Sequence, residues 1–108
     1  MFGLLRVITG PDRGQTITLV EGESRSIGRG PVTEVQLRDL AVARKHCEVR
    51  LAGGRVTLTD FNSVTGTQVN GQSVTQCELQ PGDLIRVGNT TLSFQWSSAD
   101  EQTTRGDQ

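Results

Sequence analysis

Three short segments of the chain carry side chains that are suited to binding an anion. They are Gly28-Arg29, Ala43–His46 and Thr65–Gly71. A planar guanidinium offers paired donors to a phosphate group, and a second cation adds further charge-assisted hydrogen bonds. Arg29 and Arg44 supply these two cations, and glycine-rich turns lie along the same segments. Together the segments predict a local anion-binding surface that is assembled from loops.

The single histidine, His46, lies in the second segment. A catalytic histidine works with a nucleophile and an orienting carboxylate, and a metal-binding histidine works with further Cys or His ligands. Neither arrangement accompanies His46 in the sequence, so we expect a hydrogen-bonded structural histidine. The lack of a nucleophile and base pair predicts a binding module and not an enzyme, with no metal or other cofactor.

Composition narrows the class of partner. The 108 residues suffice for one domain with a single core. Lys and Arg total 11 and Asp and Glu total 12, so the chain has no general attraction to nucleic acid or to an anionic membrane. Aromatic residues are too few for a base-stacking platform, and no run approaches the roughly 18 apolar residues that span a bilayer. We therefore expect neither nucleic acid nor a membrane as the partner.

The two cysteines, Cys47 and Cys77, lie in unrelated segments without CxxC spacing. Both occupy alternating apolar positions, so we expect small buried residues in preference to a disulfide. The start of the chain carries no signal-peptide pattern. These features predict a reducing, cytoplasmic location.

Most of the chain alternates short runs rich in β-branched residues with turns rich in glycine, which predicts an all-β fold, either a sandwich or a barrel. The candidate strands are residues 4–9, 15–20, 25–28, 35–37, 46–51, 56–60, 68–69, 83–87 and 91–96. Two long connections, 38–45 and 61–67, separate strands, and such loops commonly carry function. Residues 97–108 have no large apolar side chain, so we expect a domain over 1–96 and a disordered tail or linker over 97–108.

The order and spacing of these segments resemble the forkhead-associated (FHA) domain, a β-sandwich whose family is associated with phosphothreonine peptides. The resemblance covers residues 4–96 and implies a sandwich of two antiparallel sheets with about ten or eleven short strands. The matching residues are Gly28-Arg29, Arg44, His46, Asp60 with Ser63, Gly66-Thr67, Val69-Asn70-Gly71, Pro81-Gly82-Asp83, Ile85 and Gly88.

The resemblance implies that Arg29 and Arg44 approach the phosphopeptide and that His46 is architectural. We also expect structural roles for Gly28 and Gly66. We also include three neighbours as candidate peptide contacts: Thr65, Lys45 and Asn70. For Lys45 a solvated loop position is the competing interpretation. For Asn70 it is a hairpin-turn role with Gly71.

The chain departs from the family pattern at three positions. Ala43 replaces a phosphate-binding serine, Thr65 replaces a peptide-contacting asparagine, and Val64 replaces a threonine that often touches phosphate. Losing two or three hydrogen bonds of about 1 kcal/mol each lowers affinity by roughly 30- to 150-fold.

The leading interpretation is therefore a module that recognises phosphothreonine-containing or acidic protein segments in Ser/Thr kinase signalling, with weakened phosphate affinity. The alternative is a degenerate FHA domain that binds its partner independently of phosphate or helps to assemble a larger protein.

Overall fold

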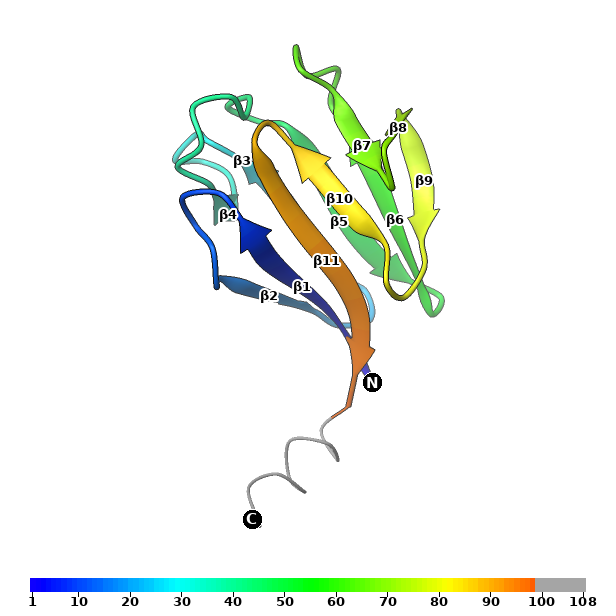
Figure 1. The fold of residues 1–108 in the computed structure, drawn as a ribbon. Coiled ribbons are helices and arrows are strands. Elements are labelled where there is room, and N and C mark those ends of the chain that lie inside the picture. The colour runs from blue at the N-terminus through cyan, green and yellow to red at the C-terminus, as the bar shows by residue number, and fades with distance from the viewer. Residues whose placement is uncertain (99–108) are drawn as a thin grey trace.

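The computed structural model describes residues 1–98, which fold into eleven β-strands without a helix. The strands are β1 (Phe2–Thr9), β2 (Thr16–Leu19), β3 (Ser24–Gly28), β4 (Val35–Gln36), β5 (Cys47–Ala52), β6 (Arg55–Asp60), β7 (Thr67–Val69), β8 (Gln72–Val74), β9 (Gln76–Leu79), β10 (Leu84–Val87) and β11 (Thr90–Ser97). They form two facing sheets (Figure 1). The predicted all-β sandwich is confirmed.

The first sheet, sheet A, has six strands in the order β2-β1-β11-β10-β7-β8, and the second, sheet B, has five in the order β4-β3-β5-β6-β9. Every neighbouring pair in sheet A is antiparallel. In sheet B, however, β3 and β4 are parallel, with Ile27 beside Val35. The expected sandwich of two antiparallel sheets is thus confirmed, with one parallel pair at the edge of sheet B.

A compact loop makes that parallel pair possible, although parallel neighbours usually need a long crossover. The Thr33 hydroxyl lies 2.6 Å from the carbonyl oxygen of Gly30 and 3.2 Å from that of Gly28. Next to it, Ser26 and Glu34 each donate a backbone N–H to the other's side-chain oxygen. These bonds fold residues 29–34 back on themselves, so that the two residues of β4 lie along β3.

The strands β8 and β9 were not among the ranges marked by the sequence. Strand β8 has three residues, Gln72–Val74, of which only Val74 is apolar, so it shows no alternating pattern in the sequence. The alternation at Cys77 and Leu79 belongs to β9. Leu79 is buried, but Cys77 is only partly buried against the core, so its expected full burial is wrong. An edge strand such as β9 leaves its side chains open on one side.

Val, Leu and Ile side chains fill the space between the sheets, as the scarcity of aromatic residues requires. Phe94 is the largest fully buried residue, and its ring meets Trp96 edge to face at 5.3 Å between centroids. Both cysteines are free, and burial raises the pKa of the Cys47 thiol to about 12. Cys47 therefore behaves as a small apolar core residue.

The two ends of the sandwich differ in the connections that they carry. The loops after β3 and β4, the loop between β6 and β7 and the β10–β11 turn gather at one end, whereas the N-terminus and the end of β11 lie at the other (Figure 1). Strand β11 continues to Ser97, one residue past the expected domain boundary, and most of the expected tail, 99–108, lies outside the described residues. No helix within residues 1–98 is long and apolar enough to cross a membrane.

Candidate phosphopeptide-binding site

The end of β3 lies directly against the segment Ala43-Arg44. Arg29 donates its backbone N–H to Ala43 at 2.9 Å, and Gly30 donates to Arg44 at 2.9 Å. A Cβ on Gly28 would lie 2.2 Å from the Arg44 carbonyl oxygen, a backbone atom. Only glycine fits such a close approach of two backbones. Gly28 therefore allows the two arginine-bearing segments to meet.

A hydrogen bond from Nε to the main chain holds the side chain of Arg29 in place. Its Nε donates to the carbonyl oxygen of Val42 at 3.1 Å, and the residue is half-buried. Among residues 1–98 this is the only hydrogen bond or ion pair of the guanidinium. The two terminal nitrogens therefore keep their donors for a ligand, which is the arrangement that suits a bidentate anion.

Arg29 is one of the residues that line an open pocket of about 270 Å³. The lining residues come from the end of β3, the loop before β5 and the loop before β7: Arg29, Leu40, Ala41, Val42, Ala43, Val64 and Thr65. All but Arg29 and Thr65 are aliphatic. The pocket therefore joins a cation to a mainly apolar surface.

Asp39 fixes the loop on the far side of the pocket. The residue is 4% exposed, and its carboxylate accepts hydrogen bonds from the Ala41 N–H at 2.9 Å, the Asn89 N–H at 2.7 Å and the Thr90 hydroxyl at 2.8 Å. Burial acts to raise the pKa of Asp39, but these bonds and the nearby Arg86 charge outweigh it and keep the pKa below its usual value. The carboxylate ties the loop to the β10–β11 turn.

His46 joins two loops from within the core. Its ring is fully buried, Nδ1 accepts the backbone N–H of Ala43 at 3.0 Å, and Nε2 lies 2.8 Å from the carbonyl oxygen of Gly66. Because an amide N–H can only donate, Nδ1 must be the acceptor and Nε2 must carry the proton. The ring is therefore a neutral connector between the Ala43 loop and the loop before β7.

Asp60 shapes the second of these loops. Its carboxylate accepts the Ser63 hydroxyl at 2.6 Å, the Ser63 N–H at 3.1 Å and the Thr67 hydroxyl at 2.8 Å. Burial acts to raise the pKa of Asp60, but the Ser63 and Thr67 hydrogen bonds outweigh it and lower the pKa. The loop 61–66 is therefore closed at its base by one carboxylate.

The two other candidate cations are exposed and differ in their surroundings. Arg44 has no side-chain hydrogen bond or ion pair within residues 1–98. Lys45 places its ammonium 4.7 Å from the centre of the Phe61 ring, which is a cation–π contact. Arg44 is therefore available to a ligand, and Lys45 is drawn toward the neighbouring loop.

Comparison with known proteins sets this geometry in a family. A family model described as "Inner membrane component of T3SS, cytoplasmic domain" matches residues 6–98. The chain is 37% identical to "Glycogen accumulation regulator GarA" of Mycolicibacterium smegmatis over 91 residues. This aligned region covers 84% of the chain and 57% of that regulator. A solved structure described as "Structural and functional analysis of phosphothreonine-dependent FHA domain interactions" shares 36% identity, with a TM-score of 0.82 and 91% and 99% of the two chains covered.

The chain belongs to the FHA-domain family. The FHA domain of FhaA, solved in complex with the intracellular domain of Rv3910, is also similar, at 38% identity and a TM-score of 0.78 over 86% of this chain and 99% of that one. The chain spans 57% of GarA and 15% of the Mycobacterium tuberculosis protein FhaA. What is shared is thus a whole FHA domain and only part of the curated relatives.

The three departures from the FHA pattern all lie at the pocket. Ala43 and Val64 line it without any side-chain hydrogen-bonding group, and Val64 is 99% exposed. Thr65 keeps a hydroxyl, but that hydroxyl donates to the Ala41 carbonyl oxygen at 3.2 Å. A ligand can therefore use the Thr65 oxygen only as an acceptor.

Of the five candidate contacts, Arg29 and Thr65 line the pocket, whereas Arg44, Lys45 and Asn70 are not among its lining residues. Asn70 is used in a turn. Its amide donates to the Asp83 carboxylate at 2.9 Å and accepts the Leu84 N–H at 3.0 Å. The residue has a φ of 52° and Gly71 a φ of 84°, as the two-residue turn between β7 and β8 requires. The side chain is thus used in joining this turn to the start of β10.

Sequence reasoning missed two residues that hold the FHA loops, Asp39 and Thr33. An Asp two residues before a turn amide is a recognisable local signal, and Asp39 with Ala41 fits it. The other partners of Asp39 lie about fifty positions away, at Asn89 and Thr90. Such a contact depends on the tertiary fold and leaves no mark in one sequence.

Proposed function

We propose that this FHA domain recognises phosphothreonine-containing or acidic segments of partner proteins in Ser/Thr kinase signalling, in the cytoplasm. Arg29 and Arg44 supply the charge, and Thr65 contributes an acceptor. The proposal draws support from the relative whose interactions are described as phosphothreonine-dependent and from FhaA, whose FHA domain was solved with the intracellular domain of another protein. In this proposal Lys45 is a cation at the periphery of the site, and Asn70 contributes by fixing the turn between β7 and β8.

The observation that carries the proposal is the state of the Arg29 guanidinium. Nε is used internally by Val42, Arg29 lines the pocket, and the two terminal nitrogens have no partner among the described residues. A preorganised guanidinium loses less entropy on binding an anion than a free one does. This is the arrangement that phosphate recognition by an arginine requires.

We further propose that affinity for phosphate is weaker than a complete set of contacts would give. Ala43 and Val64 offer no hydroxyl, and the Thr65 proton is directed to Ala41. Two charged contacts of about 1.5 to 3 kcal/mol each remain, without two or three neutral ones of about 1 kcal/mol. The site retains a preference for anions and loses part of its strength.

Calorimetric titration of a phosphothreonine peptide library and its unphosphorylated twin tests the proposal. We expect the phosphorylated peptides to bind more tightly, and Arg29→Ala to remove that difference. Arg55→Ala is the matched control, because Arg55 is exposed at the start of β6 and is no part of the pocket. Equal binding of both libraries, unchanged by Arg29→Ala, would contradict the proposal.

A restoring double variant examines the weakening separately. Ala43→Ser with Thr65→Asn returns the side chains of the family pattern at two positions. We expect phosphopeptide affinity to rise by roughly 5- to 30-fold, since each hydrogen bond contributes about 1 kcal/mol. No gain would show that the loop geometry and not the missing groups limits binding.

A second candidate function is binding without phosphate, or assembly of a larger protein. The observation in its favour is the apolar character of the pocket edge, where Leu40 is 86% exposed and Val64 is 99% exposed. Large exposed aliphatic side chains beside a pocket suit an apolar partner surface. In that case Leu40→Ser with Val64→Ser abolishes binding of the partner and Arg29→Ala leaves it unchanged.

A further inference from the structure

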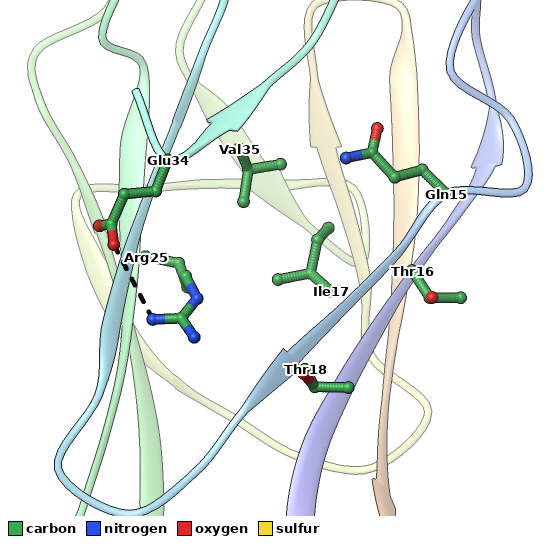
Figure 2. A pocket seen from close by; sticks show the side chains of 7 residues that line it. All are labelled: Gln15, Thr16, Ile17, Thr18, Arg25, Glu34 and Val35. Carbon is green, nitrogen blue, oxygen red and sulfur yellow. Dashed lines mark ion pairs between the residues drawn. The ribbon is translucent and has the colours of Figure 1, made fainter. Parts of the chain in front are cut away.

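A second open groove, which shares no lining residue with the Arg29 pocket, lies between the edges of the two sheets. Figure 2 shows its walls, with β2 on one side and the segments that carry Arg25, Glu34 and Val35 on the other. Its volume is about 450 Å³. The remaining lining residues all come from the start of β2 and the residue before it: Gln15, Thr16, Ile17 and Thr18.

The edge strand β2 has backbone groups that face this groove. Val7 donates to the Gln15 carbonyl oxygen at 2.8 Å, and hydrogen-bonded pairs alternate along an antiparallel ladder. With Leu5 opposite Ile17, the backbone groups of Ile17 face β1 and those of Thr16 and Thr18 face away from it. Within residues 1–98, no partner takes these outward N–H and C=O groups.

Just beyond the C-terminal end of β2, the outward backbone groups do have partners, unlike those of Thr16 and Thr18. Val20, the next outward-facing position, donates its N–H to the Glu23 carboxylate at 2.9 Å and accepts the Glu23 N–H at 2.9 Å. On the opposite wall, the backbone N–H groups of Ser26 and Glu34 are each hydrogen-bonded to the side chain of the other residue. Among the described lining residues, Thr16 and Thr18 of β2 therefore offer the groove a hydrogen-bonding strand edge.

The other three edges of the described sandwich are less suited to adding a strand. β4 and β8 have two and three residues, and β9 carries the charged Glu78. Short or charged edges are the usual protection against an added strand. β2 has four residues, with no charge and no proline, so it lacks that protection.

The charged residues on the wall opposite β2 indicate which kind of side chain the groove would bind. Arg25 is paired with Glu23 at 2.9 Å and with Glu34 at 3.8 Å, so that one guanidinium meets two carboxylates. The Glu34 side chain is 54% exposed and that of Arg25 is 27% exposed. The surplus and more accessible charge is therefore negative, and it favours a basic side chain in the groove.

We propose that this groove binds an extended segment of a partner protein, which adds to sheet A beside β2 and places a basic side chain against Glu34. The segment forms backbone hydrogen bonds with Thr16 and Thr18. Its inward side chains alternate, so that an aliphatic residue covers Ile17 and Val35 and a Lys or Arg two positions away meets Glu34. The site is separate from the Arg29 pocket and does not depend on phosphate.

The probe is a displayed library of short random peptides, selected on the full 108-residue chain. We expect enriched peptides to pair an aliphatic with a basic residue two positions apart, and to shift the amide resonances of Thr16, Thr18 and Val35. Failure to enrich any peptide overturns the proposal. So does a set of shifts confined to the Arg29 pocket.

Thr18→Pro removes one outward donor without breaking the ladder with β1, because proline is tolerated where an edge N–H faces outward. We expect about 5-fold or greater loss of peptide binding, whereas the matched variant Thr18→Val keeps the N–H and binds as the wild type does. Glu34→Gln is expected to remove the preference for the basic residue. Unchanged binding by Thr18→Pro overturns the proposal.

Methylating alternate amide nitrogens of the selected peptide tests the pairing without altering the protein. We expect methylation of the amides that face β2 to weaken binding by about 10-fold or more, and methylation of the intervening amides to leave it unchanged. Equal effects of the two patterns overturn strand addition. Sedimentation that shows a dimer dissolved by Thr18→Pro would instead assign the edge to a second copy of the chain and overturn the proposal.

Discussion

The base and the rim of the Arg29 pocket are built on different principles. The base consists of Asp39, His46 and Asp60, whose side chains are satisfied by the protein itself. The rim consists of Leu40 and Val64, which line the pocket, and of Arg44, which follows the lining residue Ala43. All three are exposed and have no side-chain hydrogen bond or ion pair within residues 1–98. The comparison indicates that the base determines where the loops lie and that the rim determines what they contact. Substitutions in the two groups should therefore change different measured quantities.

The largest effect is expected for His46→Ala. The change leaves the Ala43 N–H and the Gly66 carbonyl oxygen without partners and opens a cavity in a fully buried position. We expect the free energy of unfolding to fall by about 3 to 5 kcal/mol in urea titrations. His46→Gln keeps an acceptor and a donor and should lose less. A loss below about 1 kcal/mol for His46→Ala would contradict the connecting role of the ring.

Asp39→Ala should follow, because it removes the acceptor of three donors that come from two loops. We expect a loss of about 2 to 4 kcal/mol in the same titrations, since each abandoned buried donor costs about 1 kcal/mol or more. Asp39→Asn fills the same space and keeps one acceptor oxygen, so an intermediate loss is expected. Equal stability of both variants and the wild type would show that the loop is held by other contacts.

Lowering the pH should reduce the stability that Asp39 and Asp60, at the base of the pocket, give to the fold. Folding lowers the pKa of Asp39 and Asp60, so each carboxylate stabilises the fold fully above its ordinary pKa of about 4. That stabilisation is lost as the pH falls through the lower folded-state value. We expect the free energy of unfolding to decline on acidification below about pH 4. The decline should be shallower in Asp60→Asn, and an identical pH profile would contradict the assignment to Asp60.

The same division explains how much could be predicted from the sequence. Alternation and turn residues predict the all-β sandwich because each strand buries one face, a local property that residues such as Val49 and Leu51 display directly. The three segments proposed to bind an anion were recognisable because glycine and basic residues stand close together in the chain. Arg29, Ala43 and Thr65 do come together around one pocket in the structure.

What could not be predicted depends on contacts between distant segments. The Asp39 bonds to the β10–β11 turn and the parallel position of β4 follow from the tertiary fold. The Asn70 amide is bound to Asp83 and Leu84, partners that the sequence alone does not reveal, since it predicts only the turn with Gly71 or a place near a ligand. The outward edge of β2 depends on which residues of β1 lie opposite, and a one-residue slip would reverse it.

Arg29→Lys should separate binding from stability at the boundary between base and rim. Lysine keeps the charge but loses the Nε bond to Val42 and the paired donors of a guanidinium. We expect phosphothreonine-peptide affinity to fall by about 10-fold, with the free energy of unfolding within about 1 kcal/mol of the wild type. A conserved affinity would mean that charge alone is recognised and that the geometry of the Arg29 guanidinium has no part in it.

The smallest effect on stability is expected for Val64→Ser, because a side chain that is 99% exposed loses almost nothing on unfolding. The free energy of unfolding should stay within about 0.5 kcal/mol of the wild type. Its effect on binding distinguishes the two proposed functions. If phosphate is the main determinant, the new hydroxyl at the rim leaves phosphopeptide affinity equal or higher, whereas a partner held by apolar contacts binds more weakly. A titration of the variant against both peptide libraries therefore shows whether Val64 is a lost phosphate contact or a gained apolar one.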